Sequence, residues 1–463
     1  VLFGDTDDVD RKVCVMSFEH VERNANNQMK QLVELSDPND VITIIYTSGS
    51  TGTPKGAMIT DSAYNHNLHG MVRGDPEHIF SFCPLAHMSD RKHVAVNICN
   101  GSSVAIFQKD MNDIFTHIQL VRPTTLVSTP RLWNILYGEY QRQLLIDKEK
   151  FPDKEPSEVE KNLLIQFKSM LGDRLETIVT GGAPTAPSVL RFLKECYQCV
   201  VSNGYGATEV GGILQAGYLK NDVQYKLVDV PEMKYYSTDK PYPRGELCVK
   251  TKEMFAGYFN NKELTNTVID RDGFHHTGDI VAQKSERCFE LIDRLKNIFK
   301  LAQGEFVAPE YVEIQYLKSP YVDQIYIYGE SSRSYVLAVV VPNKLALKDW
   351  AITNTILQVS EPSDEELLQL YSDEAVRDLF EKEFVRIAGE TGLQNYEIPR
   401  GFILEHEPFT NENGKLTALL KIARVQCELC YRERLNALYS ELQEKEHKQL
   451  QSELVDLLES LLD

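Results

Sequence analysis

Short runs rich in β-branched residues alternate with segments of helical pattern from residue 41 to about residue 290. The runs read VITIIY, SSVAIF, TTLVST, LETIVTGG and QCVVSNGYG. Strands that alternate with helices predict an α/β fold in which loops at the strand ends carry the ligand. We expect the first run, VITIIY, to be a buried strand. The charged stretch 138–170 interrupts the alternation, and we expect it to be a solvated helical excursion without a functional role.

The pattern changes after about residue 290. Runs such as VDQIYIYGES and SYVLAVVVPN surround one helical segment, PEYVEIQYLKS, which predicts a smaller α+β domain with YVLAVVV as a central strand. Residues 362–391 and 425–463 have the pattern of amphipathic, heavily charged helices. We therefore expect a large domain (1–294), a smaller domain (295–424) and a segment (425–463) that is either a packing helix or a linker to a further domain.

Charge and hydropathy narrow the classes of partner. The formal net charge of −19 disfavours nucleic acid and anionic membrane surfaces, because both would repel an acidic chain. No apolar run approaches the roughly 18 residues that cross a bilayer, so we expect no transmembrane segment. A small molecule or another protein is the favoured partner.

The N-terminus and the cysteines bear on the compartment. The opening residues, VLFGDTDDVDRK, have no initiator Met, basic patch or apolar stretch, so we expect the chain to begin partway through a longer one and to carry no signal or transit peptide. Nine Cys without secretory features favour reduced thiols and a cytoplasmic location. We interpret the pairs Cys196/Cys199 and Cys427/Cys430 as buried or surface thiols in preference to a four-thiolate zinc site.

The stretch YTSGSTGTPKG, from Tyr46 to Gly56, has the composition of a loop that binds phosphate. Its glycines let backbone N–H groups approach an anion, its hydroxyls add donors, and Lys55 adds a charge. It departs from the G-x-x-x-x-G-K-[ST] pattern of kinases and ATPases, since Pro54 stands where the second glycine belongs and Gly56 follows the lysine. We therefore expect phosphate binding in a different geometry.

This loop resembles the signature loop of the adenylate-forming enzymes, which include acyl-CoA synthetases, luciferases and the adenylation domains of peptide synthetases. Further segments follow in the order of that family: CPLAHMSDR, VTGGAP, NGYGATE, RGELCVKTKEMFAGYF, DGFHHTGD, DRLKNIFKLAQGEFVAPEYVE and LTALLKIAR. Together they cover Tyr46 to Arg424. The resemblance implies a large α/β adenylation domain, with an apparently incomplete N-terminal part, followed by a smaller, mobile α+β domain.

The resemblance also implies a two-step reaction. A carboxylate attacks the α-phosphate of Mg-ATP to give an acyl-adenylate and pyrophosphate, and a thiol then displaces AMP. The opening loop would hold the β- and γ-phosphates through Thr47, Ser48, Gly49, Ser50, Thr51, Gly52, Thr53 and Lys55.

Other motifs would bind the rest of the nucleotide. By resemblance, Tyr205 would lie against the adenine, Thr208 near the α-phosphate, Glu209 on Mg²⁺ and Asp279 on the ribose hydroxyls. Three softer assignments border the nucleotide: Gly182, Asn203 and Gly204.

The resemblance gives roles to several basic residues as well. Arg294 would contact the ribose or the α-phosphate, Lys296 would mark the hinge between the two domains, and Lys300 would lie near the nucleotide. His87 stands where the family often has a histidine beside the substrate carboxylate.

Two lysines compete for the role of the catalytic residue. Lys415 follows a glycine, as in the common N-G-K ending of the family, whereas Lys421 fits the longer pattern of Thr417, Lys421 and Arg424. We favour Lys421 as the ammonium that reaches the α-phosphate and the attacking carboxylate. Leu420 replaces the usual glycine before it, which leaves Lys415 as the alternative.

Within the family, the chain most resembles the adenylation domains of carboxylic acid reductases and next the long-chain acyl-CoA synthetases. The first resemblance implies activation of a fatty or aromatic acid and transfer to the phosphopantetheine thiol of a downstream carrier domain, followed by a reductase domain; the second implies a standalone long-chain fatty acid–CoA ligase that uses CoA. Only about 45 residues precede the signature loop, which keeps a third interpretation open, a non-catalytic remnant or fragment.

Overall fold

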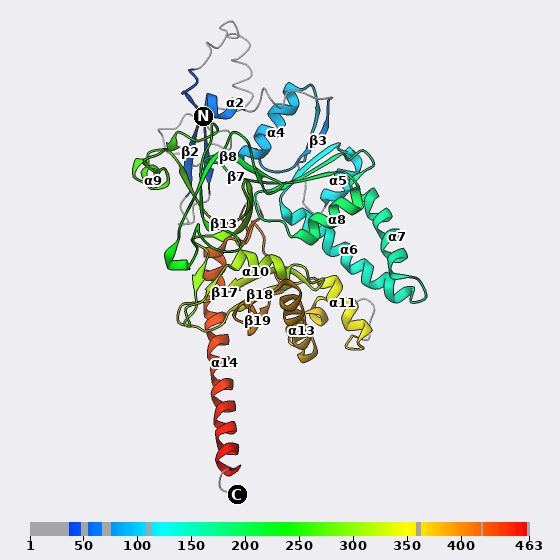
Figure 1. Cartoon of the computed structure of the whole chain (residues 1–463). Coiled ribbons are helices and arrows are strands. Elements are labelled where there is room, and N and C mark those ends of the chain that lie inside the picture. The colour runs from blue at the N-terminus through cyan, green and yellow to red at the C-terminus, as the bar shows by residue number, and fades with distance from the viewer. Residues whose placement is uncertain are drawn as a thin grey trace, which may run out of the picture.

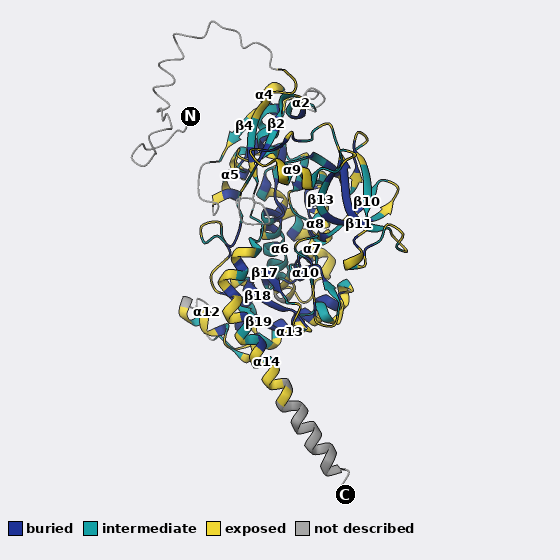
Figure 2. Cartoon of the chain, turned by 90° about the vertical axis from the view of Figure 1, so that its left-hand side faces the viewer, coloured by how far each residue is buried: buried dark blue, intermediate teal, exposed yellow. Residues whose placement is uncertain are grey.

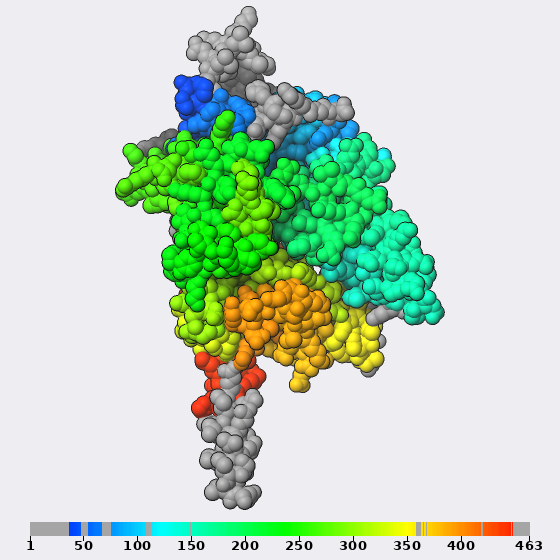
Figure 3. Space-filling model, in the orientation of Figure 1, coloured from blue at the N-terminus to red at the C-terminus, as the bar shows by residue number. Residues whose placement is uncertain are grey.

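The computed structural model of the chain describes residues 37–47, 54–66, 76–107, 113–357, 363–417 and 420–460. It consists of a larger unit, built around a long sheet, and a smaller unit, built around a short one (Figure 1). Figure 3 shows the smaller unit, yellow to orange, lying directly against the larger unit. The predicted arrangement, a large α/β unit followed by a smaller α+β unit, is confirmed.

The long sheet has eleven strands and two halves of different character. One half is parallel, in the order β4 (Ser103–Ile106), β3 (His78–Ser81), β5 (Thr125–Ser128), β6 (Thr177–Gly181) and β7 (Val200–Ala207). From β7 the sheet continues with antiparallel strands, in the order β8 (Gly211–Gln215), β9 (Tyr218–Leu219), β14 (Cys288–Arg294), β13 (His275–Ser285), β11 (Arg244–Lys250) and β10 (Gln224–Val228).

Helices pack on the parallel half and supply its core. Leu126 and Ile178 of the sheet lie in one buried cluster with Trp133, Ile118 and Leu193 of the surrounding helices. The helices of the larger unit are α2 (Asp61–Asn65), α4 (Met88–Cys99), α5 (Ile114–Val121), α6 (Pro130–Lys150), α7 (Pro156–Lys168), α8 (Pro187–Tyr197) and α9 (Lys262–Val268), with 3₁₀ turns at Ser169–Leu171 and Pro231–Met233. Proline begins α6, α7 and α8, where its fixed φ suits a first helical turn and no N–H is needed.

Two expectations about this unit need correction. The run VITIIY forms a strand, β1 (Val41–Thr47), but it pairs with β2 (Lys55–Thr60) and β12 (Gly257–Tyr258) in a separate antiparallel sheet, and Tyr46 is 62% exposed, so the strand is not buried as a whole. The stretch 138–170 is helical as expected, but it is not simply solvated, because Tyr140, Leu163 and Phe167 lie in the core.

The smaller unit has a three-stranded sheet with both faces covered. Its order is β17 (Val322–Tyr328), β18 (Leu337–Pro342), β19 (Gly401–Leu404), so the predicted central strand lies in the middle. One face of β18 packs against a cluster that includes helices α10 (Pro309–Tyr316), α11 (Lys344–Thr353) and α13 (Glu374–Thr391), and the other against helix α14 (Arg424–Ser460). Coverage on both faces explains why the strand is continuously apolar.

The remaining elements of this unit are short. They are the hairpin of β15 (Phe299–Lys300) and β16 (Phe306–Val307), helix α12 (Asp364–Leu370) and a 3₁₀ turn at Asn395–Glu397. Figure 2 shows buried residues, in dark blue, concentrated in the sheets and exposed residues, in yellow, on helix surfaces such as those of α12 and α14. No helix in the described part of the chain is both long and apolar enough to cross a membrane.

Helix α14 has two parts with different surroundings. Its first turns place Cys427, Tyr431, Leu435 and Tyr439, four residues apart, in the core of the smaller unit. Its C-terminal part projects away from the body of the protein (Figure 1). The segment 425–463 is expected from the sequence to be either a packing helix or a linker. Its first turns pack against the smaller unit. Because Cys196 lies in the core of the larger unit and Cys427 in this one, the two C-x-x-C pairs do not form one site.

The packing of α14 yields a prediction about stability. Leu435→Ala should destabilise the protein by about 2–4 kcal/mol, because Leu435 is fully buried and its removal leaves a cavity. Leu429→Ala, on the same helix at a position that is 61% exposed, should change stability by less than about 0.5 kcal/mol. Urea unfolding of both variants checks this, and equal midpoints for the two would contradict the packing described.

Candidate functional site

The ends of the central strands bring the predicted nucleotide-binding residues together. Gly181, at the end of β6, lies opposite Gly204 of β7 in the parallel ladder, and Asn203 lies opposite Thr180. Gly181 is required by close approach, since a Cβ on it would lie 2.8 Å from the carbonyl oxygen of Gly204. Gly182 follows with a φ of +83°, a left-handed conformation that glycine adopts without strain. The backbone at this strand end is therefore open to a ligand.

Asp279 lies at the centre of the site. Its Oδ2 accepts a hydrogen bond of 2.5 Å from the Tyr205 hydroxyl, and its Oδ1 lies 3.1 Å from Nε of Arg294, which pairs with Asp279 across β13 and β14. Burial raises the pKa of the Asp279 carboxyl, while the Arg294 charge and the Tyr205 hydrogen bond act in the opposite direction. Three residues predicted to contact the nucleotide thus form one group, joined by a hydrogen bond and an ion pair.

The part of strand β13 that carries Asp279 is irregular in its pairing with β11, and β11 holds it in place. Glu246 accepts a hydrogen bond from the backbone N–H of Gly278 at 3.0 Å and lies 2.8 Å from Nδ1 of His276. Thr277 donates to the carbonyl of Leu247 at 2.6 Å. Cys248 also lies 3.4 Å from Nδ1 of His276, so a carboxylate, a thiol and an imidazole converge, but they bond to one another and to this part of β13. We interpret them as a brace for Asp279.

Glu209 lies in the turn between β7 and β8, which also contains Thr208. The hydroxyl of Tyr258 donates to Oε1 of Glu209 at 2.9 Å. Burial, with a contribution from the Glu209 charge, raises the pKa of Tyr258, which therefore stays protonated and remains a donor. Tyr258 lies in the family motif RGELCVKTKEMFAGYF, but the sequence alone predicts no role for it.

The signature loop is described only at its two ends. Ser48, Gly49, Ser50, Thr51, Gly52 and Thr53 lie outside the described residues. Thr47 and Lys55 face each other as the last pair of the β1–β2 hairpin, and the Lys55 ammonium lies 5.8 Å from the centroid of the Tyr258 ring.

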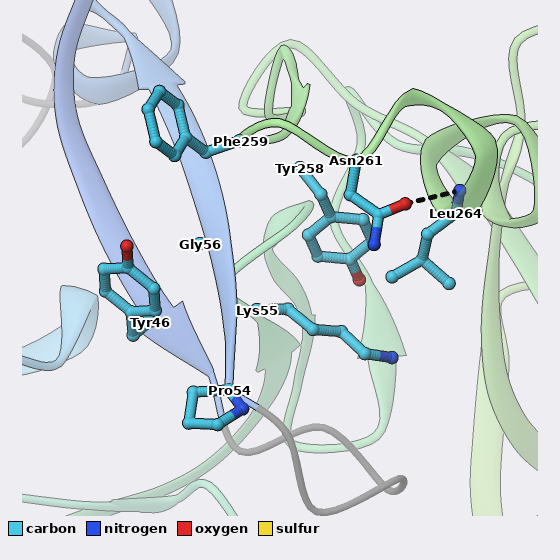
Figure 4. A pocket seen from close by; sticks show the side chains of 8 residues that line it. All are labelled: Tyr46, Pro54, Lys55, Gly56, Tyr258, Phe259, Asn261 and Leu264. Atoms are coloured by element: carbon cyan, nitrogen blue, oxygen red, sulfur yellow. Dashed lines mark hydrogen bonds between the residues drawn. The ribbon is translucent and has the colours of Figure 1, made fainter.

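Lys55 and Tyr258 border a cavity of about 320 Å³. Figure 4 shows the Lys55 side chain running alongside Tyr258 in this cavity. The full lining is Tyr46, Pro54, Lys55, Gly56, Tyr258, Phe259, Asn261 and Leu264. Tyr258 thus lies between two predicted site residues, since its ring is near the Lys55 ammonium and its hydroxyl donates to Glu209.

Lys421 reaches this site from the smaller unit. Burial lowers the pKa of Lys421, the charge of Arg294 lowers it further, and the charges of Glu310 and Asp279 oppose the shift. Burial also lowers the pKa of His87, and the charge of Lys421 contributes. Lys421 therefore lies within electrostatic range of Asp279, Arg294 and His87, and His87 itself is the N-cap residue of α4.

Lys415 has a different environment. Its ammonium lies 2.7 Å from Glu407 and 5.3 Å from the centroid of the Tyr431 ring, so its charge is already paired within the smaller unit. Leu420, which replaces the glycine usual in the family, has a φ of +58°. A left-handed backbone is the conformation that favours glycine, which gives a physical reason for that preference at this position.

Lys300 belongs to the smaller unit. It is exposed, and its ammonium lies 5.4 Å from the centroid of the Phe306 ring in the β15–β16 hairpin. Its predicted place near the nucleotide stays a prediction.

The hydrogen bond between Tyr205 and Asp279 can be tested by stability. Tyr205→Phe should destabilise the protein by about 1–3 kcal/mol, because a buried carboxyl loses one of its donors. Tyr218→Phe, at a position that is 61% exposed, is the matched control and should have little effect. The midpoint of urea unfolding measures both, and an unchanged midpoint for Tyr205→Phe would show that this bond does not hold Asp279.

Similarity to known proteins agrees with this geometry. A family model described as AMP-binding enzyme matches residues 4–259, more than half of the chain. The carboxylic acid reductase of Mycobacterium tuberculosis is 38% identical over 417 residues, which are 88% of this chain and 34% of the relative. The peroxisomal long chain acyl-CoA synthetase 7 of Arabidopsis thaliana is 36% identical over 437 residues, 88% of this chain and 62% of the relative.

A solved structure is similar over most of the chain. The A-PCP didomain of the carboxylic acid reductase from Segniliparus rugosus, in complex with AMP, matches with a TM-score of 0.79 and 35% identity and covers 95% of this chain and 59% of that one. The chain spans about a third of the length of the carboxylic acid reductases it matches and less than two thirds of the synthetase. From the family model and the shared fold, this chain belongs to the AMP-binding enzyme family.

Proposed function

We propose that this chain is an adenylation unit that uses ATP to activate a carboxylic acid. The product would be an acyl-adenylate, with release of pyrophosphate, and the acyl group would then pass to a thiol. The observation that carries the proposal is the buried group of Asp279, Tyr205 and Arg294 in the larger unit, whose charges act on Lys421 of the smaller unit. A site assembled from two units suits a reaction that joins two substrates.

The buried group around Asp279 would bind the nucleoside part of ATP. A carboxylate with two oxygens suits the two ribose hydroxyls, and Tyr205 beside it provides an aromatic face for the adenine. The open space beside the backbone of Gly182 adds room for the ring. Arg294 would then donate hydrogen bonds to the ribose or neutralise charge at the α-phosphate.

The β- and γ-phosphates would lie toward Lys55 and the signature loop. Glu209 fits a Mg²⁺ ion, because its carboxylate offers hard oxygen ligands and one of these oxygens is oriented by Tyr258. Bound there, Mg²⁺ would neutralise charge on the phosphate oxygens. Lys55 would hold the leaving pyrophosphate, as a point charge at the mouth of the cavity.

The reacting atoms would meet between His87 and Lys421. A carboxylate oxygen attacks the α-phosphorus, a new P–O bond forms, and the bond to the bridging oxygen of the β-phosphate breaks as pyrophosphate leaves. The Lys421 ammonium would stabilise the negative charge that develops on the α-phosphoryl oxygens and help hold the carboxylate. Its positive charge, not proton transfer, is the property that this role requires.

Two versions of the proposal differ in the thiol that accepts the acyl group. In a protein similar to the carboxylic acid reductases, it would be the phosphopantetheine of a carrier domain, followed by a reductase domain; in a protein similar to the acyl-CoA synthetases, it would be CoA. We favour the first version, with 1–294 and 295–424 as the two parts of the adenylation unit and 425–463 leading toward the carrier, since the end of α14 projects from the body (Figure 1).

The test of the overall function is ATP–pyrophosphate exchange that depends on an added acid. A panel of fatty and aromatic acids, each with and without CoA, should include at least one acid that supports exchange. Release of acyl-CoA would favour the ligase, and exchange without such release would favour the carrier-dependent version. No exchange with any acid would support the remaining alternative, a non-catalytic remnant.

The choice between the two lysines is a separate prediction. Lys421→Ala should slow adenylate formation by about 100- to 1,000-fold, because a preorganised positive charge is lost from the transition state, while ATP still binds. Lys415→Ala removes a lysine paired with Glu407 and should retain adenylate formation, which makes it the matched control. Single-turnover formation of acyl-adenylate measures both, and full activity of Lys421→Ala would overturn the assignment.

A further inference from the structure

One face of helix α6 is turned toward the smaller unit. Arg131 and Arg142 on this face are 11 residues apart, about three turns of an α-helix, so their side chains leave the helix in nearly the same direction. Gly138 lies between them, and a Cβ there would lie 3.8 Å from the side chain of Asn343 in the smaller unit. The face belongs to the larger unit but contacts the unit that carries Lys421.

Two ion pairs cross from this face. Nη2 of Arg131 lies 3.1 Å from Oδ2 of Asp323 on β17, and Nη1 of Arg131 donates to the Asp323 carbonyl at 3.3 Å. Nη1 of Arg142 lies 2.9 Å from Oδ2 of Asp349 on α11. The arginine side chains are only 20% and 17% exposed, so solvent screens these pairs less than ordinary surface pairs.

The apolar packing of this interface is incomplete. A cavity of about 290 Å³ lies between the units, lined by side chains of both, including Ile135 of α6 and Val322 of β17. Gln141 adds a hydrogen bond of 3.2 Å to the carbonyl of Lys318. Where side chains do not interlock, directional ion pairs decide the relative orientation of two surfaces.

A continuous set of contacts leads from Asp323 to Lys421. Gln324, the next residue on β17, accepts from the backbone N–H of Phe409 at 2.7 Å and donates to its carbonyl at 2.9 Å. Phe409 begins the segment that carries Lys421, and Arg424, at the other end of that segment, pairs with Glu313 of α10. A shift of β17 relative to α6 would therefore move both the segment and its lysine.

We propose that Arg131 and Arg142 are positioning residues for Lys421. They hold the smaller unit against α6 so that the lysine reaches Asp279 and Arg294. Both arginines act at a distance, because no hydrogen bond or ion pair in the described part of the chain joins either of them to Asp279 or Arg294. The proposal rests on the proposed function for its effect on rate, but its structural part, the placement of Lys421, can be measured without any activity.

The test uses the full chain and four variants. In the first, Arg131→Gln is combined with Arg142→Gln. The second, Arg131→Asp, places two carboxylates opposite each other, and the third adds Asp323→Arg to restore a pair of reversed polarity. The fourth, Arg432→Gln, removes an ion pair of similar length that lies within α14 alone, and serves as the matched control.

Rate and placement are measured separately. In the first two variants, adenylate formation should slow by about three- to tenfold, and KM for ATP should change by a smaller factor, because most of the nucleotide residues belong to the larger unit. Labelling of Lys421 by limiting acetic anhydride, read by mass spectrometry against exposed Lys445, should rise by a similar factor. The reversed pair should restore both values, and the control should change neither.

The outcomes separate this proposal from the proposed function. If the wild-type chain gives no acid-dependent exchange, the function fails, and the labelling of Lys421 still decides the positioning role. If the wild-type chain is active and the two arginine variants match it in rate and labelling, the positioning role is wrong. Loss of activity that the reversed pair does not restore, with unchanged labelling, would also overturn it.

Discussion

The ion pair between Asp279 and Arg294 is the constraint on which the site depends. The two residues face each other across β13 and β14, and Arg294 is the last residue of β14 before the chain enters the smaller unit. Asp293, one residue earlier, points the other way and accepts a hydrogen bond from the backbone N–H of Glu310, near the start of α10, at 2.8 Å. Adjacent side chains of one strand alternate in direction, so this strand end anchors the candidate nucleotide site on one side and the smaller unit on the other.

Buried acids surround this junction, and their environments differ. Burial, together with the nearby charge of Glu310, raises the pKa of Asp293 to about 7. Burial raises the pKa of Glu313 to about 8, although Arg424 pairs with it. Removing a carboxylate from water costs more than one neighbouring cation returns. Buried acidic groups are thus concentrated where the chain passes from the larger unit to the smaller unit.

Sequence reasoning found the local features and missed those that depend on pairing between distant segments. The strands after residue 41 and the central strand of the smaller unit follow from β-branched runs, which record local preference. The exposure of β1 was not predicted, because an apolar run does not say whether a partner covers each face. Glu246 and Tyr258 lie in a motif recognised by resemblance, yet their contacts join residues 32 and 49 positions apart. The face of α6 had no signal either, since its charges were typical of a solvated helix.

The position of Lys421 carries an electrostatic cost that the rest of the structure must offset. Its ammonium is moved out of water and toward Arg294, and both effects lower its pKa, while Asp279 and Glu310 compensate in part. Without a ligand, therefore, the placement of the smaller unit relies on contacts elsewhere in the interface, and these include the ion pairs of Arg131 and Arg142 on α6. A polyphosphate bound between Lys421 and Arg294 would give each cation an anion to face. The net electrostatic interaction of Lys421 with its surroundings would then change from repulsive to attractive. Binding of the nucleotide and approach of the lysine would in that case reinforce each other, and the same charge that opposes the empty arrangement would stabilise the filled one.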